Sequence, residues 1–132
     1  MNVILALLLG SLLSVTPEAS PHRIDADAIL GTWLTPDDNA RVQIARCEEE
    51  TFCGEIVWLR DGPPEGLGVR ILEGFTYAGD ERWEGGKINN PRDGNARDAE
   101  LRLEGDDLLK VRVSAGLLRR TVEWTRVPDG QP

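Results

Sequence analysis

Apolar and polar side chains alternate along the last third of the chain, and this alternation is the clearest structural signal in the sequence. Residues 99–104, 109–115 and 121–126 form three alternating runs, separated by short segments rich in glycine and aspartate. Successive side chains of a β-strand point to opposite faces, so each run predicts a strand with one buried and one exposed face. The turn residues between the runs predict hairpin connections.

Earlier segments give weaker versions of the same signal. Segments with strand character are 31–35, 41–44, 53–59, 69–76, a short piece around Trp83, and 87–89. In 53–59, Ile56 and Trp58 are predicted on one face, with Val57 and Leu59 on the other. The Gly85-Gly86 pair predicts a β-bulge or a close backbone approach, and 24–30 predicts one short helical turn.

The predicted elements give an all-β fold of about eight strands, with turn signals roughly every 8 to 12 residues. This pattern is typical of an antiparallel sandwich or an up-and-down barrel. Consecutive hairpins without a long crossover favour the barrel, which also leaves no sheet edge exposed. Residues 20–132 are expected to form this single domain.

Residues 1–19 are expected to be a cleaved signal peptide. Residues 3–15 form an uncharged apolar run, which is long enough for the core of an export signal but too short to cross a bilayer. An uncleaved anchor and a helix buried in the domain remain as alternatives. Export predicts a periplasmic or secreted protein, with no membrane span left after the signal is removed.

Cys47 and Cys53 are the only cysteines, and they lie at facing ends of two predicted strands joined by a short loop. A hairpin connection would bring the two thiols together. In an exported protein such a pair predicts a structural disulfide rather than a metal site or a redox centre. Chain-entropy arithmetic for so short a loop gives about 2 to 2.5 kcal/mol of stabilisation.

Several sequence motifs occur in an order that resembles a family of small exported bacterial proteins, the domain of unknown function number two-one-four-seven. The motifs are Gly31-x-Trp33, Cys47…Cys53-Gly-x-Ile-Val-Trp-Leu59, Trp83-Glu-Gly-Gly-Lys-Ile88, Pro91…Asp93-Gly94 and Trp124-Thr-Arg126-Val127. The chain departs from the family pattern in a shortened segment at 60–68, in Asn89-Asn90 before Pro91, and in the absence of a tyrosine near 95–97.

The resemblance implies a lipocalin-like barrel. In such barrels a Gly-x-Trp motif opens the first strand and a basic side chain from the last strand covers the tryptophan. Gly31, Trp33 and Arg126 match those positions, so we expect a structural closure with a cation–π contact. A ligand-binding role for Trp33 and Arg126 is the weaker alternative.

Charge and composition exclude several classes of function. The formal net charge of −8 disfavours binding to nucleic acid and to anionic membrane surfaces. The single histidine, His22, lies in the predicted N-terminal tail, so no histidine of the domain is available for a catalytic triad or a metal site. No phosphate-binding loop or calcium loop is present. The sequence therefore predicts no cofactor and no metal, and an enzyme is the least favoured class.

The barrel interior is the remaining candidate site, because an eight-stranded barrel can hold one small ligand. Trp58, Trp83 and Trp124 are candidates to line it, with Arg119 or Arg120 as partner of an anionic head group. These tryptophans could equally form a filled core. Two functions follow, a binder of a small apolar or amphipathic ligand and, as the alternative, a non-catalytic interaction or structural protein of the envelope. The sequence does not set the oligomeric state.

Overall fold

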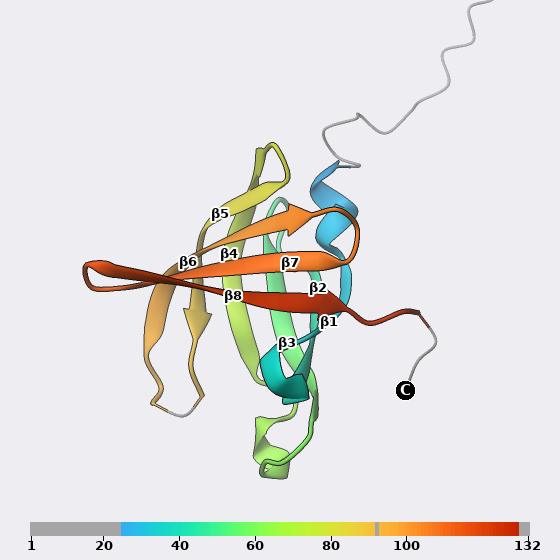
Figure 1. Cartoon of the computed structure of the whole chain (residues 1–132), viewed down its shortest axis with the longest axis vertical. Helices are drawn as coiled ribbons and strands as arrows, with labels where there is room; N and C mark the ends of the chain where they lie inside the picture. The colour runs from blue at the N-terminus through green and yellow to red at the C-terminus, as the bar shows by residue number, and fades with distance from the viewer. Residues whose placement is uncertain (1–24, 92, 130–132) are drawn as a thin grey trace, which may run out of the picture.

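Eight antiparallel strands follow one another around a closed barrel in the computed structural model, which describes residues 25–91 and 93–129 (Figure 1). The strands are β1 Gly31–Leu34, β2 Ala40–Arg46, β3 Phe52–Leu59, β4 Arg70–Gly79, β5 Arg82–Asn89, β6 Ala96–Glu104, β7 Leu108–Ala115 and β8 Leu118–Arg126. Each strand pairs with its neighbours in sequence, and β1 pairs with β8 to close the barrel. The predicted all-β, up-and-down barrel is therefore confirmed.

The part of the chain that the structure describes contains three short 3-10 turns. They are η1 Asp27–Ile29, η2 Pro36–Asp38 and η3 Pro64–Gly66. The first lies within the predicted helical turn at 24–30. The predicted signal peptide and His22 lie outside the described residues. In the part of the chain that the structure describes, no helix combines the length and the apolar character needed to cross a bilayer.

A β-bulge in β3 changes which of its side chains share a face, compared with the prediction. Trp58 pairs with Arg41 of β2, whereas Ile56 pairs with Val42, so Val57 is an extra residue on β3. An extra residue shifts the alternation by one position. Ile56 therefore points into the barrel, and Val57 and Trp58 are both exposed, at 44% and 37%. The prediction that Ile56 and Trp58 share a face is wrong.

The Gly85-Gly86 pair does form the predicted bulge with a close approach. The β5–β6 register shifts between Trp83 and Gly86, and Gly85 has a φ of 79°, which favours glycine. A Cβ atom on Gly86 would lie 2.5 Å from the ring of Phe75. The bulge thus lets β5 pass directly over a buried aromatic ring.

Side chains fill the middle of the barrel. The ten largest fully buried side chains, each less than 2% exposed, are Trp33, Trp83, Phe52, Phe75, Ile29, Leu72, Leu101, Leu109, Val42 and Val111. They come from seven of the eight strands and from η1. Close packing of this kind supplies most of the driving force for folding a small domain.

Candidate ligand site at the open end of the barrel

The two ends of the barrel are built differently. The closed end, as we call it, carries η1 and the β2–β3, β4–β5 and β6–β7 connections. The open end carries the β1–β2, β3–β4, β5–β6 and β7–β8 connections. An up-and-down barrel places alternate connections at opposite ends, so this division follows directly from the topology.

Arg126 ties together the closed end. Arg126 of β8 pairs with Trp33 of β1, and its guanidinium carbon lies 4.3 Å from the centroid of the Trp33 ring. The guanidinium donates hydrogen bonds to the carbonyl oxygens of Ala28 at 2.7 Å, Leu30 at 2.8 Å and Asp106 at 2.7 Å. One side chain therefore links η1, the entry to β1 and the β6–β7 turn.

Gly31 accommodates this arrangement at the start of β1. Its φ is 132°, and a Cβ atom there would lie 2.8 Å from a terminal nitrogen of Arg126. A larger residue would therefore displace the guanidinium as well as strain the backbone. The geometry of Gly31, Trp33 and Arg126 is that of a closure, with the polar atoms of Arg126 directed at backbone oxygens.

At the closed end, the indoles of Trp33 and Trp83 donate hydrogen bonds to backbone carbonyls of η1 and of the residue before it. The Nε1 atom of Trp33 donates to the carbonyl of Ile29 at 3.0 Å, and that of Trp83 donates to the carbonyl of Ala26 at 3.1 Å. Both side chains are fully buried. Tyr77 packs against Trp83, with ring centroids 5.0 Å apart. Trp83, a candidate ligand contact, thus lies beneath the N-terminal turn, with its only polar atom satisfied.

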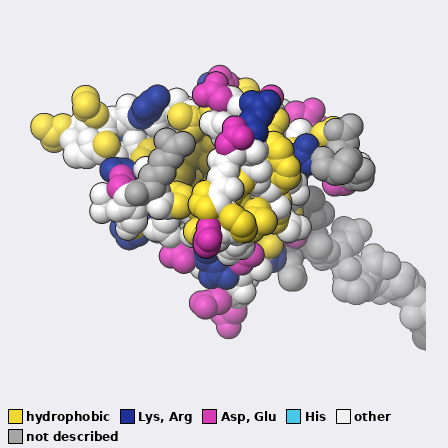
Figure 2. Space-filling view, turned by 90° about the horizontal axis from the view of Figure 1, so that it is seen from below, with side chains coloured by type: hydrophobic (Ala, Val, Ile, Leu, Met, Phe, Trp, Pro, Cys, Tyr) yellow, Lys and Arg dark blue, Asp and Glu magenta, His cyan; other side chains and the backbone are white. Residues whose placement is uncertain are grey.

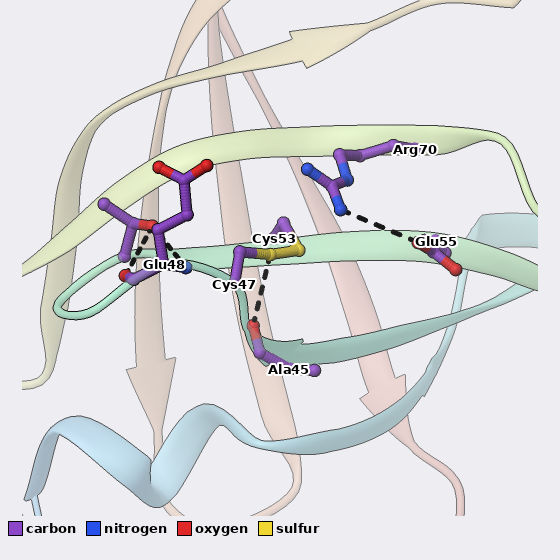
Figure 3. Close-up of a disulfide and its surroundings, with 7 residues drawn as sticks. Ala45, Cys47, Glu48, Cys53, Glu55 and Arg70 are labelled. Atoms are coloured by element: carbon purple, nitrogen blue, oxygen red, sulfur yellow. Dashed lines mark hydrogen bonds and ion pairs between the residues drawn. A yellow bond between two sulfur atoms is a disulfide. The ribbon is translucent and has the colours of Figure 1, made fainter.

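The disulfide between Cys47 and Cys53 joins β2 and β3 at the closed end, with Cα atoms 5.9 Å apart (Figure 3). The predicted pairing is confirmed. Between the cysteines, Thr51 and Glu48 exchange hydrogen bonds that hold the turn, including Thr51 Oγ1 to the Glu48 carbonyl at 3.0 Å. The bond lies on the outside of the barrel wall, away from the interior.

At the open end, inward-facing apolar side chains are only partly buried. Ile88 of β5, Val113 of β7 and Val122 of β8 pack on the core but retain exposure. Val69, whose carbonyl accepts a hydrogen bond from the Ile56 N–H, belongs to the same set. The open-end residues, as we define them, are Val69, Ile88, Arg97, Val113, Arg120 and Val122. Figure 2 views the molecule from this end and shows hydrophobic side chains among charged ones.

Arg120 lies on the inner face of β8. It pairs with Val113, whereas Arg119 pairs with Ser114, and the buried Trp124 is in phase with Arg120. Alternation therefore places Arg120 above Val122 and Trp124, toward the barrel mouth. Within the described residues, no hydrogen bond or ion pair engages the Arg120 side chain. Arg97, which is paired with Ile88, also lies on the inner face but is held by Asp93 at 3.3 Å.

The electrostatics around Arg97 are set by the β5–β6 connection. Asp93 Oδ1 accepts a hydrogen bond from the Asn95 N–H at 2.8 Å. This bond, aided by the Arg97 guanidinium, holds the pKa of Asp93 below its ordinary value. Asp93 is therefore ionised at neutral pH, and Arg97 has a fixed anionic partner that Arg120 lacks.

Arg119 lies on the outer wall, apart from the other candidates. It borders a shallow cleft of about 270 Å³ over β6, β7 and β8, lined by side chains of both charges. Among them Lys110 and Glu104 form an ion pair at 3.1 Å. Trp58 is also outside, with the Arg41 guanidinium 5.2 Å from its ring centroid. The five candidate residues therefore do not form one cluster.

Of the candidates, only Trp124 and Arg120 lie on one inner face along the same strand. Sequence reasoning missed Ile88, Arg97, Val113 and Val122 as a set. The sequence could have separated the two arginines of β8. Arg120 is four residues from Trp124 and so shares its face of the strand, whereas Arg119 lies on the opposite face. Among residues 25–91 and 93–129, no group of three or more histidine, cysteine or acidic side chains is placed to hold a metal ion.

The family described as uncharacterised protein conserved in bacteria, DUF2147, has a model that matches residues 31–126. The chain belongs to this family. The match begins at Gly31 and ends at Arg126, the two residues that meet at the closed end. The family resemblance seen in the sequence is thereby confirmed. A search of curated proteins found no match.

Two solved structures share the fold. A protein from Helicobacter pylori, described as belonging to the lipocalin family, is 20% identical with a TM-score of 0.64. That comparison covers 76% of this chain and 83% of the other. A redesigned β-barrel is 15% identical with a TM-score of 0.52, over 80% of this chain and 96% of the other. These comparisons establish a lipocalin-like barrel and extend no further than the fold.

Proposed function

We propose that this chain is an exported binding protein that holds a small amphipathic anion at the open end of its barrel. The observation that carries the proposal is the set of inward-facing, partly exposed apolar side chains Ile88, Val113 and Val122 beside Arg120. An apolar surface with one convergent charged group is the usual composition of a small-molecule site.

Arg120 is the group that would bind the anion. Arginine presents a planar fork of donors that matches carboxylate and phosphate oxygens. The neighbouring Arg97 is already occupied by Asp93, at 3.3 Å. A carboxylate or phosphate at the mouth would therefore be bound through Arg120, with the ligand's apolar part on Val113 and Val122.

The filled interior limits the size of the ligand. Trp33, Trp83 and Phe75 occupy the interior of the barrel and are fully buried. An eight-stranded barrel whose interior is packed in this way has room only near its mouth. The proposed ligand is therefore a short- or medium-chain or ring-containing anion seated at the rim, not a long chain threaded through the barrel.

Export is supported by the disulfide between Cys47 and Cys53. Disulfides persist in the periplasm and outside the cell and are rare in the reducing cytosol. Together with the predicted signal peptide at 1–19, the disulfide supports a periplasmic or secreted protein.

The alternative is an envelope interaction or structural protein with a closed core. The same packed interior favours it, because ten large side chains are each less than 2% exposed. The two functions differ in whether the open-end residues contact a small molecule.

Calorimetry with decanoate and with decyltrimethylammonium separates the two functions. We expect decanoate to bind and the cation to bind at least about tenfold more weakly, because Arg120 attracts only the anion. The Arg120→Gln variant should lose this preference. Arg119→Gln, one residue away on the outer wall, is the matched control and should bind like the wild type. Equal binding of both amphiphiles, or none, would overturn the proposal.

Native mass spectrometry of protein from its own envelope fraction then shows whether a natural ligand accompanies it.

A further inference from the structure

The β7–β8 hairpin extends well beyond the barrel wall and ends in two exposed leucines (Figure 1). Leu117 is fully exposed and Leu118 is 75% exposed. Ala115 pairs with Leu118, so Gly116 and Leu117 form a two-residue turn in which Gly116 has a φ of 64°. Glycine in the first turn position is typical of a tight hairpin, and the second position normally carries a polar residue.

Basic side chains surround this apolar tip. Residues 108–122 contain Lys110, Arg112, Arg119 and Arg120 and no acidic residue, within a chain of net charge −8. Lys110, nearest the barrel, is paired with Glu104. Among the described residues, Arg119 and Arg120 at the tip have no ion pair. Figure 2 shows the hydrophobic tip at the far left, with a basic side chain between it and the barrel.

The length of the hairpin separates the tip from the acidic body of the protein. From Leu118 to Val122, which packs on the core, the strand rises about 13 Å at 3.3 Å per residue. The Debye length in physiological salt is about 8 Å. A surface touching the tip would therefore experience the local basic charge more strongly than the net negative charge.

We propose that the β7–β8 hairpin is a contact site for an anionic phospholipid surface. Leu117 and Leu118 enter the boundary between head groups and acyl chains, and Arg119, which pairs with Ser114 on the outer face, binds lipid phosphate. Apolar side chains beside basic ones are the pattern of interfacial binding to an anionic leaflet. This contact is independent of the proposed ligand site and would hold even if the open end binds nothing.

The shape of the tip favours a lipid surface over a protein partner or a second copy of the chain. Two leucines at the end of a narrow hairpin form a convex point with little area. Specific protein interfaces bury about 800 Å² on each partner. A fluid lipid surface can close around a convex point, whereas a protein partner would need a matching pocket.

Flotation with vesicles tests the proposal. The full mature chain is mixed with vesicles of phosphatidylcholine alone or with about one third phosphatidylglycerol, a content high enough to give a strongly negative surface. We expect binding only to the anionic vesicles. The double variant Leu117→Ser/Leu118→Ser should bind about tenfold less, and Arg119→Gln about fivefold less. Val57→Ser, a change at an exposed apolar residue on the barrel wall, is the matched control and should bind normally.

Near-ultraviolet circular dichroism confirms that each variant retains the fold. Absence of wild-type binding to anionic vesicles would overturn the proposal. Binding that depends on Arg119 but is unchanged in the leucine variant would also overturn it, because charge alone would then explain the contact. Capture of an acidic protein through the same tip, without vesicle binding, would show that the partner is a protein.

Discussion

The closed and open ends of the barrel contrast in how their polar groups are used. At the closed end, Arg126, Trp33 and Trp83 direct their side-chain donors at backbone oxygens of η1 and its neighbours. At the open end, Arg120 faces the mouth without such a partner among the described residues, above valines that remain partly exposed. A group satisfied within the fold stabilises it, and a group left for solvent can bind something else. This difference underlies our proposal that the closed end stabilises the fold and the open end binds a ligand.

Replacing Trp83 should have the largest effect on this contrast. Trp83→Ala removes a fully buried indole and leaves the Ala26 carbonyl without its donor, so we expect a loss of about 3 to 5 kcal/mol in the free energy of unfolding. Val113→Ala at the open end should cost about 1 kcal/mol or less. Urea unfolding of both variants measures the difference. Similar losses at the two ends would contradict the assignment.

Removing the Arg126 guanidinium should be the next largest change. Arg126→Ala breaks three charged hydrogen bonds and the contact with Trp33, and we expect a cost of about 2 to 4 kcal/mol. Arg126→Lys keeps the charge but not the fork of donors, so most of the loss should remain. Thermal unfolding followed by tryptophan fluorescence reports both variants. Full rescue by lysine would show that charge alone holds the closed end.

The disulfide should contribute about 2 to 2.5 kcal/mol, because it closes a short loop. Cys47→Ser/Cys53→Ser should lower the free energy of unfolding, measured in urea, by that amount. Decanoate binding by the folded fraction should not change, since the bond lies on the wall at the closed end. Lost binding in a folded double variant would place the disulfide within the ligand site.

The smallest effect is expected at Asp93 on the open end. Its pKa is lowered in the folded protein, so its contribution to stability is present above the ordinary pKa of 3.8 and is lost as pH falls through the lowered value. Asp93→Asn should therefore be slightly less stable than the wild type at neutral pH and equal to it in strong acid. Carboxyl NMR titration measures the pKa directly, and an ordinary value would contradict the turn geometry.

The barrel was predictable because strands β6, β7 and β8 keep an unbroken period of two, and hairpin turns separate them. The orientation of Trp58 was not predictable. It depends on a bulge against β2, and no local residue in 53–59 marks the extra position. Register between strands is decided by pairing across the sheet, which a single segment does not encode.

The closed end was predictable in part. Gly31, Trp33 and Arg126 are recognisable from the family pattern, whereas the contact of Trp83 with Ala26 joins residues 57 positions apart. Such long-range contacts leave no periodic trace in the sequence. At the open end, alternation along β8 predicts that Arg120 and Arg119 lie on opposite faces. The sequence does not show that Ile88, Val113 and Val122 lie together, because they come from three strands that meet only when the barrel closes.

Methyl NMR during a titration with decanoate tests the division of the two ends most directly. We expect the methyl resonances of Ile88, Val113 and Val122 to shift together and saturate, while those of Ile44, which pairs with Gly31, and Ile29 near the closed end stay unchanged. The Arg120→Gln variant should require a higher decanoate concentration for the same shifts. Shifts centred on the core methyls, or on the outer-wall residue Val57 instead, would contradict a ligand site at the open end.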